Sequence, residues 1–358
     1  MVLALLPWIA FVVTLAMIMA LRPLAVSIAL VDRPSGRKAH KGEIPLIGGV
    51  AIFLSLLITV FIGVLLTGEA IASDRWLIAF FSGCYLLIVV GVWDDWRGLS
   101  PAIRLLVEVI AALIMITQVG VVLTDIGAIS LSGTTVFLGY FAIPFTVFAT
   151  VGVINAVNMC DGLDGLSGLL VLVMLAGLGM ANTIWGTPAE VPLLNILSGA
   201  VAGFLAFNQR MAWRNKAWVF LGDAGSMMLG YALVWLVIDL SQGSPRVITP
   251  AMALWFLAVP LLDTVTIMIR RILKGRSPFS ADREHLHHLL TRSGCSVGSA
   301  LTIMCGLAVA GCVLGMLFRH YLVPDLIVAG AFIATGVVYL LLMEYFWRTG
   351  NLFGRPIE

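Results

Sequence analysis

Charged residues are scarce in this sequence: Asp, Glu, Lys and Arg make up 11% of its 358 residues, against about 25% in an ordinary soluble domain. Apolar residues make up 61%. So few charges cannot cover the surface of a soluble protein of this length, and so many apolar residues exclude intrinsic disorder. A net charge of +2 gives no basic field, which excludes a nucleic-acid-binding protein. The composition therefore predicts a polytopic membrane protein.

Cysteine is also scarce. The chain has five cysteines, at positions 84, 160, 295, 305 and 312, and none of them forms a CxxC pair. This spacing argues against a disulfide framework and against a thiolate metal site. The cysteines are expected to be packing residues.

Long apolar runs are abundant, and they are continuous rather than alternating, which excludes a transmembrane barrel. A bilayer core of about 30 Å needs roughly 20 apolar residues as helix. The sequence predicts an all-α fold of about eleven transmembrane helices, near 3–21, 46–66, 76–93, 103–123, 136–156, 165–183, 191–208, 218–238, 250–270, 299–318 and 323–346. Proline interrupts two of these spans, at Pro144 and Pro192.

The distribution of Lys and Arg predicts the orientation. With the N-terminus placed outside, in the periplasm, only Arg75, Arg246 and Arg319 of the 21 basic residues fall in outer loops. The remaining basic residues lie on the inner side, as the positive-inside rule requires, and the C-terminus is cytoplasmic.

The first inner loop combines cations with glycines. Arg33, Arg37, Lys38, His40 and Lys41 fall within residues 33–41, and glycines follow at 48 and 49. A positive-inside loop explains the cations. An anion site is the alternative, because glycines at a helix start let backbone N–H groups approach a phosphate.

Carboxylates mark the next inner segments. Asp94 and Asp95 are adjacent at the inner end of a span, where charges are costly and usually functional. In a turn both could reach one cation, although a charge pair balanced by Arg97 is an alternative. Asp223 lies between small residues, which also suit simple helix packing.

Residues 155–165 carry two amides and two carboxylates: Asn155, Asn158, Asp161 and Asp164. The two acids could cap the following helix as a capping-box-like pair. That reading leaves the two amides unexplained, whereas a Mg²⁺ site built from hard oxygen ligands would account for all four.

Three of the five histidines, His285, His287 and His288, lie in a basic loop with Arg271. No third ligand appears at a typical zinc spacing, so a phosphate or sugar-nucleotide contact is favoured over zinc. Asp263 is expected to support this loop. Within a span, Arg104 and Glu108 are one helical turn apart and are expected to form an ion pair.

All the carboxylates of interest fall on the same predicted side of the membrane as the basic loops. Carboxylates together with Arg, Lys and His are what a metal-assisted phosphoryl site requires. A position at the cytoplasmic interface implies one water-soluble substrate and one lipid-borne substrate.

In this combination the sequence resembles the polyprenyl-phosphate N-acetylhexosamine-1-phosphate transferases. Five blocks, at residues 32–49, 94–95, 155–165, 222–226 and 285–290, occur in the family's order, which is far more specific than a lone motif. The chain is most similar to the members that start enterobacterial common antigen and many O-antigens, and residues 277–283 share that likeness. One departure is Ala102, where family members often carry a lysine, although Arg104 is retained nearby.

The resemblance implies one transmembrane transferase domain over residues 1–358, with catalytic cytoplasmic loops near 22–45, 94–102, 155–165, 209–226 and 270–298. It implies that undecaprenyl phosphate attacks the β-phosphate of UDP-N-acetylglucosamine, giving undecaprenyl-diphospho-N-acetylglucosamine and UMP. The implied cofactor is Mg²⁺, with Mn²⁺ as a substitute. The implied setting is the bacterial inner membrane, and a homodimer is the expected assembly.

The family's motifs also imply roles for single residues. Asp223 would be the principal metal ligand, and Asp94 would deprotonate or position the lipid phosphate with Asp95 beside it. Residues expected to bind substrate are Asn158, Asp161, Asp164, Arg271, Lys38 and His40, with His285, His287 and His288 facing the diphosphate and sugar. A phosphate monoester has a second pKa of about 6, so direct attack by the ionised lipid is favoured over a covalent aspartyl intermediate.

Three alternatives stay open at the level of sequence. The donor could be another UDP-N-acetylhexosamine, because such sugars differ by one hydroxyl group or its orientation. A transporter of anionic substrates is the first alternative of another class, although no internal repeat is evident. A membrane metallohydrolase that uses the histidines for zinc is the second.

Overall fold

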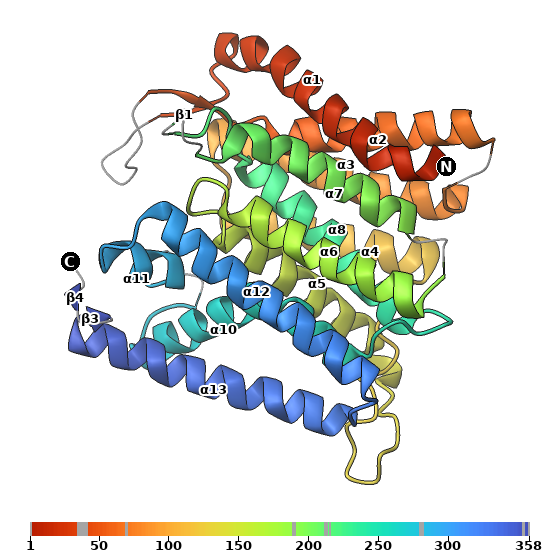
Figure 1. Cartoon of the computed structure of the whole chain (residues 1–358), viewed down its shortest axis with the longest axis vertical. Coiled ribbons are helices and arrows are strands. Elements are labelled where there is room, and N and C mark those ends of the chain that lie inside the picture. The colour runs from red at the N-terminus through yellow and green to blue at the C-terminus, as the bar shows by residue number, and fades with distance from the viewer. Residues whose placement is uncertain are drawn as a thin grey trace. The chain divides into compact units, whose positions relative to one another are not determined.

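The structure is a computed structural model that describes residues 2–33, 42–68, 71–187, 191–210, 214, 216–278, 283–352 and 355–356. Helices form nearly all of it (Figure 1). They are η1 Val2–Leu5, α1 Leu6–Ser27, α2 Gly48–Thr67, α3 Asp74–Arg97, α4 Pro101–Val119, η2 Gly139–Phe141, α5 Ala142–Met159, α6 Leu166–Trp185, α7 Val191–Asn208, α8 Gly222–Gln242, α9 Pro250–Phe256, α10 Ala258–Leu273, α11 Leu286–Arg292, α12 Val297–His320 and α13 Asp325–Thr349. Two short antiparallel pairs complete it: β1 Val31–Asp32 with β2 Ile44–Pro45, and β3 Asn351–Leu352 with β4 Arg355–Pro356.

The predicted all-α polytopic membrane protein is confirmed. Within the described ranges, nine helices are long and apolar enough to cross a bilayer, and the bent pair α9–α10 would make a tenth. The helix at 192–208 is apolar but shorter. Each of the roughly eleven predicted spans therefore corresponds to a helix or a helix pair. Pro144 and Pro192 lie in the first turns of α5 and α7, where a missing N–H costs nothing.

The predicted single span near 250–270 is wrong in detail. The chain bends by 88° between α9 and α10. Pro260 has no N–H to donate to the carbonyl of Phe256, four residues earlier, so α9 ends at Phe256. In α10 the same proline lies in the first turn, where its missing N–H is tolerated.

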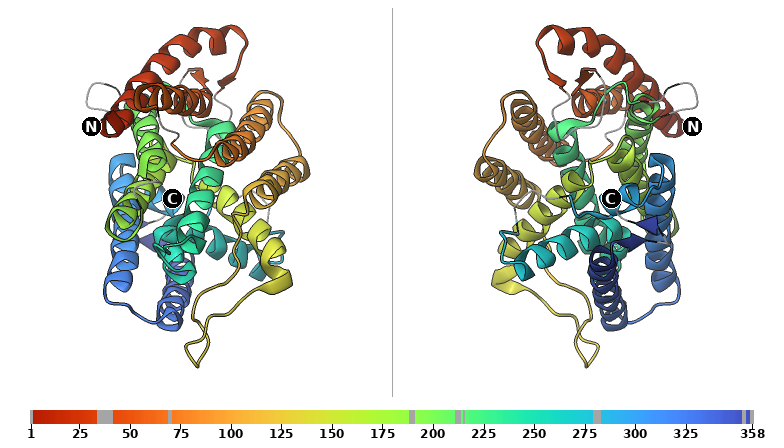
Figure 2. Two further views of the ribbon diagram at one scale, coloured as in Figure 1. Left: turned by 90° about the vertical axis from the view of Figure 1, so that its right-hand side faces the viewer. Right: turned by 90° about the vertical axis from the view of Figure 1, so that its left-hand side faces the viewer.

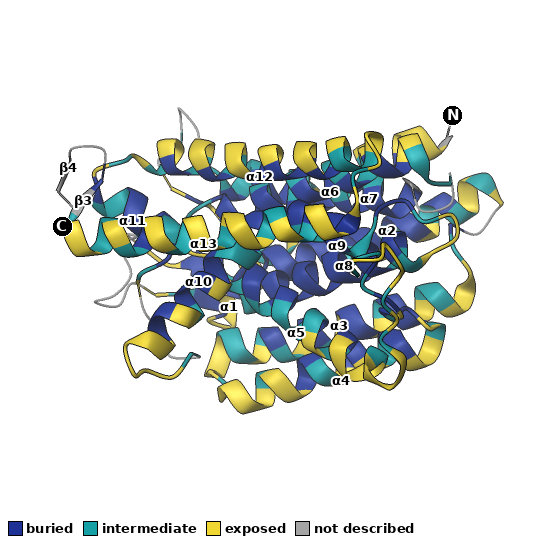
Figure 3. Cartoon of the chain, turned by 90° about the horizontal axis from the view of Figure 1, so that it is seen from below, coloured by how far each residue is buried: buried dark blue, intermediate teal, exposed yellow. Residues whose placement is uncertain are grey.

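The chain divides into two compact units, one formed by residues 1–124 and 138–247 and the other by 125–137 and 248–358. In the N-terminal unit α8 is the central helix: it packs against α2, α3, α5 and α6, and nearly all of its residues are buried (Figure 3). Helix α1, red in Figure 2, packs along α2 and α7. Because α8 is surrounded, its first turn lies beside the ends of its neighbours.

In the C-terminal unit α9 packs against α12 and α13, and α10 contacts the same two helices. The single transferase domain expected over the whole chain stays a prediction. The inner loop expected at 22–45 is shorter than predicted, since α1 continues to Ser27.

Candidate active site

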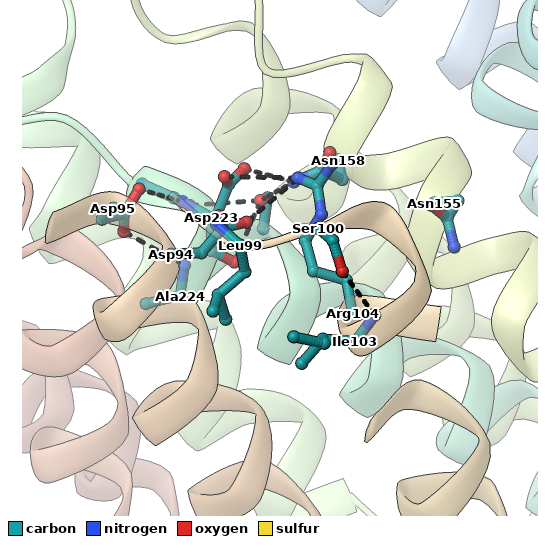
Figure 4. Close-up of polar contacts among 12 residues, drawn as sticks. Asp94, Asp95, Leu99, Ser100, Ile103, Arg104, Asn155, Asn158, Asp223 and Ala224 are labelled. Atoms are coloured by element: carbon teal, nitrogen blue, oxygen red, sulfur yellow. Dashed lines mark hydrogen bonds and ion pairs between the residues drawn. The ribbon is translucent and has the colours of Figure 1, made fainter. Parts of the chain in front are cut away.

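The first turn of α8 is fixed by a glycine and by a carboxylate from another helix. Gly222 has a φ of +74°, a conformation that favours glycine, and a Cβ there would collide with the carboxylate of Asp95. Asp95 Oδ1 accepts the backbone N–H of Asp223 at 2.9 Å, and Oδ2 accepts that of Ala224 at 3.3 Å (Figure 4). Helix α8 has no side-chain cap of its own. Asp95 therefore caps it from α3, with its negative charge at the positive end of the helix dipole.

Asp94 makes different contacts from its neighbour. Its Oδ1 accepts the N–H of Leu99 at 2.6 Å, and its Oδ2 lies 3.0 Å from Nη1 of Arg104. The same Nη1 lies 3.6 Å from Oδ2 of Asp223. Arg104 therefore bridges two carboxylates that come from α3 and α8. Both aspartates of the pair lie within α3, so the expectation that a turn lets them share one partner is wrong.

Short connections bring these groups together. Helix α3 ends at Arg97 and α4 begins at Pro101, with the side chain of Ser100 capping α4. Arg104 consequently lies in the first turn of α4, close to the last turn of α3. The expected ion pair between Arg104 and Glu108 is wrong, since Arg104 pairs with the two aspartates. The Oε2 atom of Glu108 instead accepts the amide of Asn155 at 2.5 Å.

Asn158 connects α5 to α8. Its Nδ2 donates to Oδ1 of Asp223 and to Oγ of Ser226, both at 2.8 Å. Since the amide nitrogen makes these contacts, its carbonyl oxygen is left as an acceptor or ligand. Asn155 stands apart from Asp223 in Figure 4. We call Asp94, Asp95, Arg104, Asn158 and Asp223 the acidic cluster.

The two acids of segment 155–165 have separate surroundings. Asp164 Oδ2 lies 2.7 Å from Nε of Arg210 and accepts the N–H of Ala217 at 3.3 Å, which anchors the segment before α8. Asp161 is exposed in the turn after α5, near enough to Asp223 for the two charges to repel. Helix α6 begins after Gly165 without a side-chain cap, so the capping interpretation of these acids is wrong. The four polar residues of this segment do not form one site, because only Asn158 contacts Asp223.

The start of α2 is a packing contact and not an anion site. The N–H groups of Gly48 and Gly49 donate to the carbonyls of Phe220 and Leu221 at 3.0 and 3.1 Å. A Cβ on Gly49 would collide with the backbone of Gly225. These N–H groups are therefore already paired, and the glycines let α2 approach α8. Lys38 and His40, the cationic residues expected to bind substrate, lie outside the described residues.

The histidines form a second cluster, within the C-terminal unit. Nδ1 of His285 lies 2.7 Å from Oδ2 of Asp263, which is buried in α10. Oδ1 of Asp263 accepts the N–H of Leu286 at 3.0 Å and the hydroxyl of Tyr339 at 2.8 Å. The expectation that Asp263 supports the basic loop is confirmed.

The three imidazole rings are in contact in series. The rings of His285 and His287 stack with centroids 5.7 Å apart, and those of His287 and His288 are 4.2 Å apart. His287 therefore lies against both of the other rings. Burial, followed by the nearby His288, lowers the pKa of His287 to about 3. Burial, followed by His285, lowers the pKa of His288 to about 4. Both rings are neutral at pH 7.

The arginines beside the histidines are held by the protein. Arg271 is buried, and its Nη1 donates to the carbonyl of Pro278 at 2.6 Å. Arg270 pairs with Glu284 and with Glu344, both at 3.1 Å. The geometry thus fixes Arg271 near the end of α10.

Sequence reasoning missed three contributors. Ser226 lies one helical turn after Asp223, a spacing that could have indicated a shared face. Tyr339 is far from Asp263 in sequence, so only the fold reveals its hydrogen bond. The bridging position of Arg104 depends on where α4 begins.

In the part of the chain that the structure describes, no group of three or more His, Cys, Asp or Glu residues is arranged to hold a metal ion.

Comparison with known proteins identifies the family of this chain. The chain is a membrane-embedded glycosyltransferase: it belongs to glycosyl transferase family 4, whose pattern matches residues 77–241 and so includes the whole acidic cluster. Proteins named undecaprenyl-phosphate alpha-N-acetylglucosaminyl 1-phosphate transferase are similar to it. The one from Yersinia pestis is 32% identical over 346 residues, 96% of this chain and 92% of the relative. Those from Salmonella typhi and Haemophilus influenzae are each 33% identical, over 350 and 331 residues, which are 96% and 92% of this chain and 92% and 91% of the relatives. The resemblance found in the sequence is confirmed.

Proposed function

We propose that this protein transfers N-acetylglucosamine 1-phosphate from UDP-N-acetylglucosamine to undecaprenyl phosphate and releases UMP. The observation that carries the proposal is the pair of carboxylates, Asp94 and Asp223, bridged by Arg104 within the segment that matches the family. The names of relatives aligned over 96% of the chain give the acceptor, undecaprenyl phosphate, and the transferred group, N-acetylglucosaminyl 1-phosphate. Such a step would begin synthesis of an envelope polysaccharide such as O-antigen or enterobacterial common antigen.

The charges of the acidic cluster support a requirement for Mg²⁺. When ionised, Asp94, Asp95 and Asp223 carry three negative charges, and Arg104 supplies one positive charge. Both substrates are anions, so the remaining negative charge would repel them. Asp223, Asp94 and the carbonyl of Asn158 are hard oxygen ligands, and Oδ2 of Asp94 is buried with Arg104 as its ion-pair partner. Mg²⁺ commonly takes only one or two carboxylates and completes its shell with water and phosphate, so these residues fit it, and Mn²⁺ as a substitute.

Asp223 is the proposed principal ligand, and Asp94 with Asn158 would complete the protein's share. A bound divalent cation supplies charge neutralisation at the transferred phosphate. Asp95 has both oxygens occupied by backbone N–H groups, so we assign it to holding Asp223 and not to attack. Asp94 is restrained by Leu99 and Arg104, which suits positioning of the lipid phosphate better than nucleophilic attack. Direct attack by the lipid phosphate on the β-phosphorus is therefore the proposed route.

The histidine cluster and Arg271 are proposed to contact the sugar diphosphate. His287 and His288, being neutral at pH 7, would act as hydrogen-bonding groups, and Arg271 would supply the positive charge. Asp161 and Asp164 are proposed to shape the nucleotide site.

We place the reaction at the cytoplasmic face of the bacterial inner membrane, because a nucleotide sugar is made in the cytoplasm and the basic residues favour that side.

The test is UMP release by purified protein in detergent. The complete mixture holds UDP-N-acetylglucosamine, undecaprenyl phosphate and Mg²⁺, and each is omitted in turn. UMP that needs all three supports the proposal. If UMP appears only with another UDP-N-acetylhexosamine, the chemistry stands and the sugar is wrong. Substrate flux without UMP would favour the transporter, and activity that needs zinc but not Mg²⁺ would favour the metallohydrolase.

A further inference from the structure

Asp263 is a buried carboxylate whose contacts the proposed reaction does not yet use. Only 1% of its surface is exposed, and three donors from separate parts of the C-terminal unit converge on it. They are Nδ1 of His285, the N–H of Leu286 and the hydroxyl of Tyr339, at 2.7, 3.0 and 2.8 Å. A carboxylate can only accept hydrogen bonds when ionised, so each of these groups donates.

This arrangement determines how the ring of His285 is presented. Because Nδ1–H donates to Asp263, the other ring nitrogen, Nε2, is directed away from the carboxylate. Among the described residues no group hydrogen-bonds to Nε2. The ring is further restrained by stacking on His287, at an interplanar angle of 13°. A carboxylate that fixes the tautomer and orientation of a histidine is a recurring device in enzyme sites.

We propose that Asp263, itself held by Tyr339, is a positioning residue that keeps Nδ1–H of His285 turned inward and presents Nε2, the acceptor nitrogen of that tautomer, to a hydroxyl or amide N–H group of the sugar-nucleotide substrate. The proposal rests on the proposed transferase function for the identity of that substrate. It does not rest on that function for the orientation of the ring. Asp263 would not touch the substrate, and its influence on turnover would pass through His285.

A positioning role for Asp263 and a purely structural role make different predictions for double variants. A carboxylate needed only for folding would contribute independently of the His285 side chain. A carboxylate that acts through His285 contributes nothing once that side chain is gone. The two cases give different results in a double-mutant cycle, in which residues that act as a unit are not additive.

The cycle uses full-length protein in detergent with Asp263→Asn, His285→Gln and the double variant, each assayed for UMP release. We expect Asp263→Asn to lower kcat by about 10- to 100-fold, the range found when a carboxylate that orients a metal-binding histidine is removed, with little change in KM. His285→Gln should lower kcat at least as far. The double variant should be no slower than His285→Gln alone. Losses that multiply in the double variant would overturn the proposal.

Two controls accompany the cycle. Tyr339→Phe removes one donor to Asp263 and should lower kcat by a few-fold, whereas Tyr345→Phe, on the exposed face of the same helix, should not. Asp325→Asn removes another buried carboxylate of this unit, one that accepts from the N–H of Ala128. If it lowers kcat as much as Asp263→Asn does, the effect of Asp263 is general destabilisation and the proposal fails.

A second measurement does not depend on turnover. The chain has five histidines, so protein labelled with ¹⁵N in the imidazole rings gives few signals. The signal lost in His285→Gln should report an Nδ1–H tautomer in the wild type and should change in Asp263→Asn. An Nε2–H tautomer in the wild type would overturn the positioning role even in an active enzyme. Absence of UMP release together with the expected tautomer would instead count against the proposed function.

Discussion

At the scale of single residues, the adjacent aspartates are not equivalent. Asp95 has both oxygens on the backbone of α8, whereas Asp94 faces Arg104. Asp95→Ala should leave two N–H groups of α8 unpaired and lower the free energy of unfolding by about 1–2 kcal/mol, the cost of losing an N-cap. Asp94→Asn should reduce UMP release with a smaller effect on stability. Denaturation midpoints and turnover, measured on both variants, would reveal the division. Equal destabilisation by the two changes would contradict it.

Asp223 is the residue on which the proposed metal site depends most. Asp223→Asn should lower turnover by at least about 100-fold, because it removes preorganised charge at the reacting phosphate. It should also weaken the dependence on Mg²⁺, while the protein stays folded. Near-normal turnover would exclude the metal role. Asp239→Asn is the matched control: it lies on the same helix, on the predicted outer side, and should be nearly silent.

Burial of the neutral His287 ring should make the stability of the folded protein depend on pH. Its pKa in the folded protein is about 3, below the value of about 6.5 in an unfolded chain, because burial disfavours the charged ring. Protonation of His287 therefore favours unfolding. The stability that the neutral ring contributes is fully present above about pH 6.5 and is lost as the pH falls toward 3. Melting temperatures in detergent should decline between pH 7 and pH 4.5. His287→Phe, which cannot titrate, should make that decline shallower than in the wild type, and parallel declines would contradict this account.

At the scale of elements, the contact between α2 and α8 is set by the missing side chain of Gly49. A methyl group there would meet the backbone of Gly225, which cannot move aside as a flexible side chain could. Gly49→Ala should therefore cost about 1–3 kcal/mol of stability through overpacking and should displace the first turn of α8, lowering turnover as well. Gly179→Ala, on α6 with no atom near the added methyl, is the control and should leave both unchanged. Thermal unfolding and UMP release measure the two effects.

The elements were largely predictable from the sequence, and the contacts between them were not. Long apolar runs give the helices, because each must satisfy its backbone within the bilayer. The apolar run over 250–270 predicts one continuous span, and its composition does not reveal the break at Leu257. Charge at helix ends indicated Asp94, Asp95 and Asp223 as a group. Which acid caps α8 and which faces Arg104 depends on the direction of each side chain, and spacing along one helix does not determine contacts with another.

At the scale of the whole molecule, the composition clearly indicates a polytopic membrane protein. It carries no information about the oligomeric state. A homodimer stays a prediction, testable by mass measurement of the protein in detergent. The orientation is likewise a prediction, since it rests on the concentration of basic residues in the predicted inner loops. It matters for function because the acidic cluster must face the compartment that holds the nucleotide sugar.

Thiol labelling can test that orientation. Leu131, between α4 and η2, is 96% exposed and predicted to lie outside, whereas Arg348, near the end of α13, is exposed and predicted to lie inside. The five natural cysteines are buried or half-buried, which keeps background labelling low. In spheroplasts a membrane-impermeant maleimide should label Leu131→Cys at once and Arg348→Cys only after permeabilisation. Inverted vesicles should give the opposite order. Labelling of Arg348→Cys in intact spheroplasts would place its end of α13 outside, and the proposed cytoplasmic reaction would then have to be abandoned.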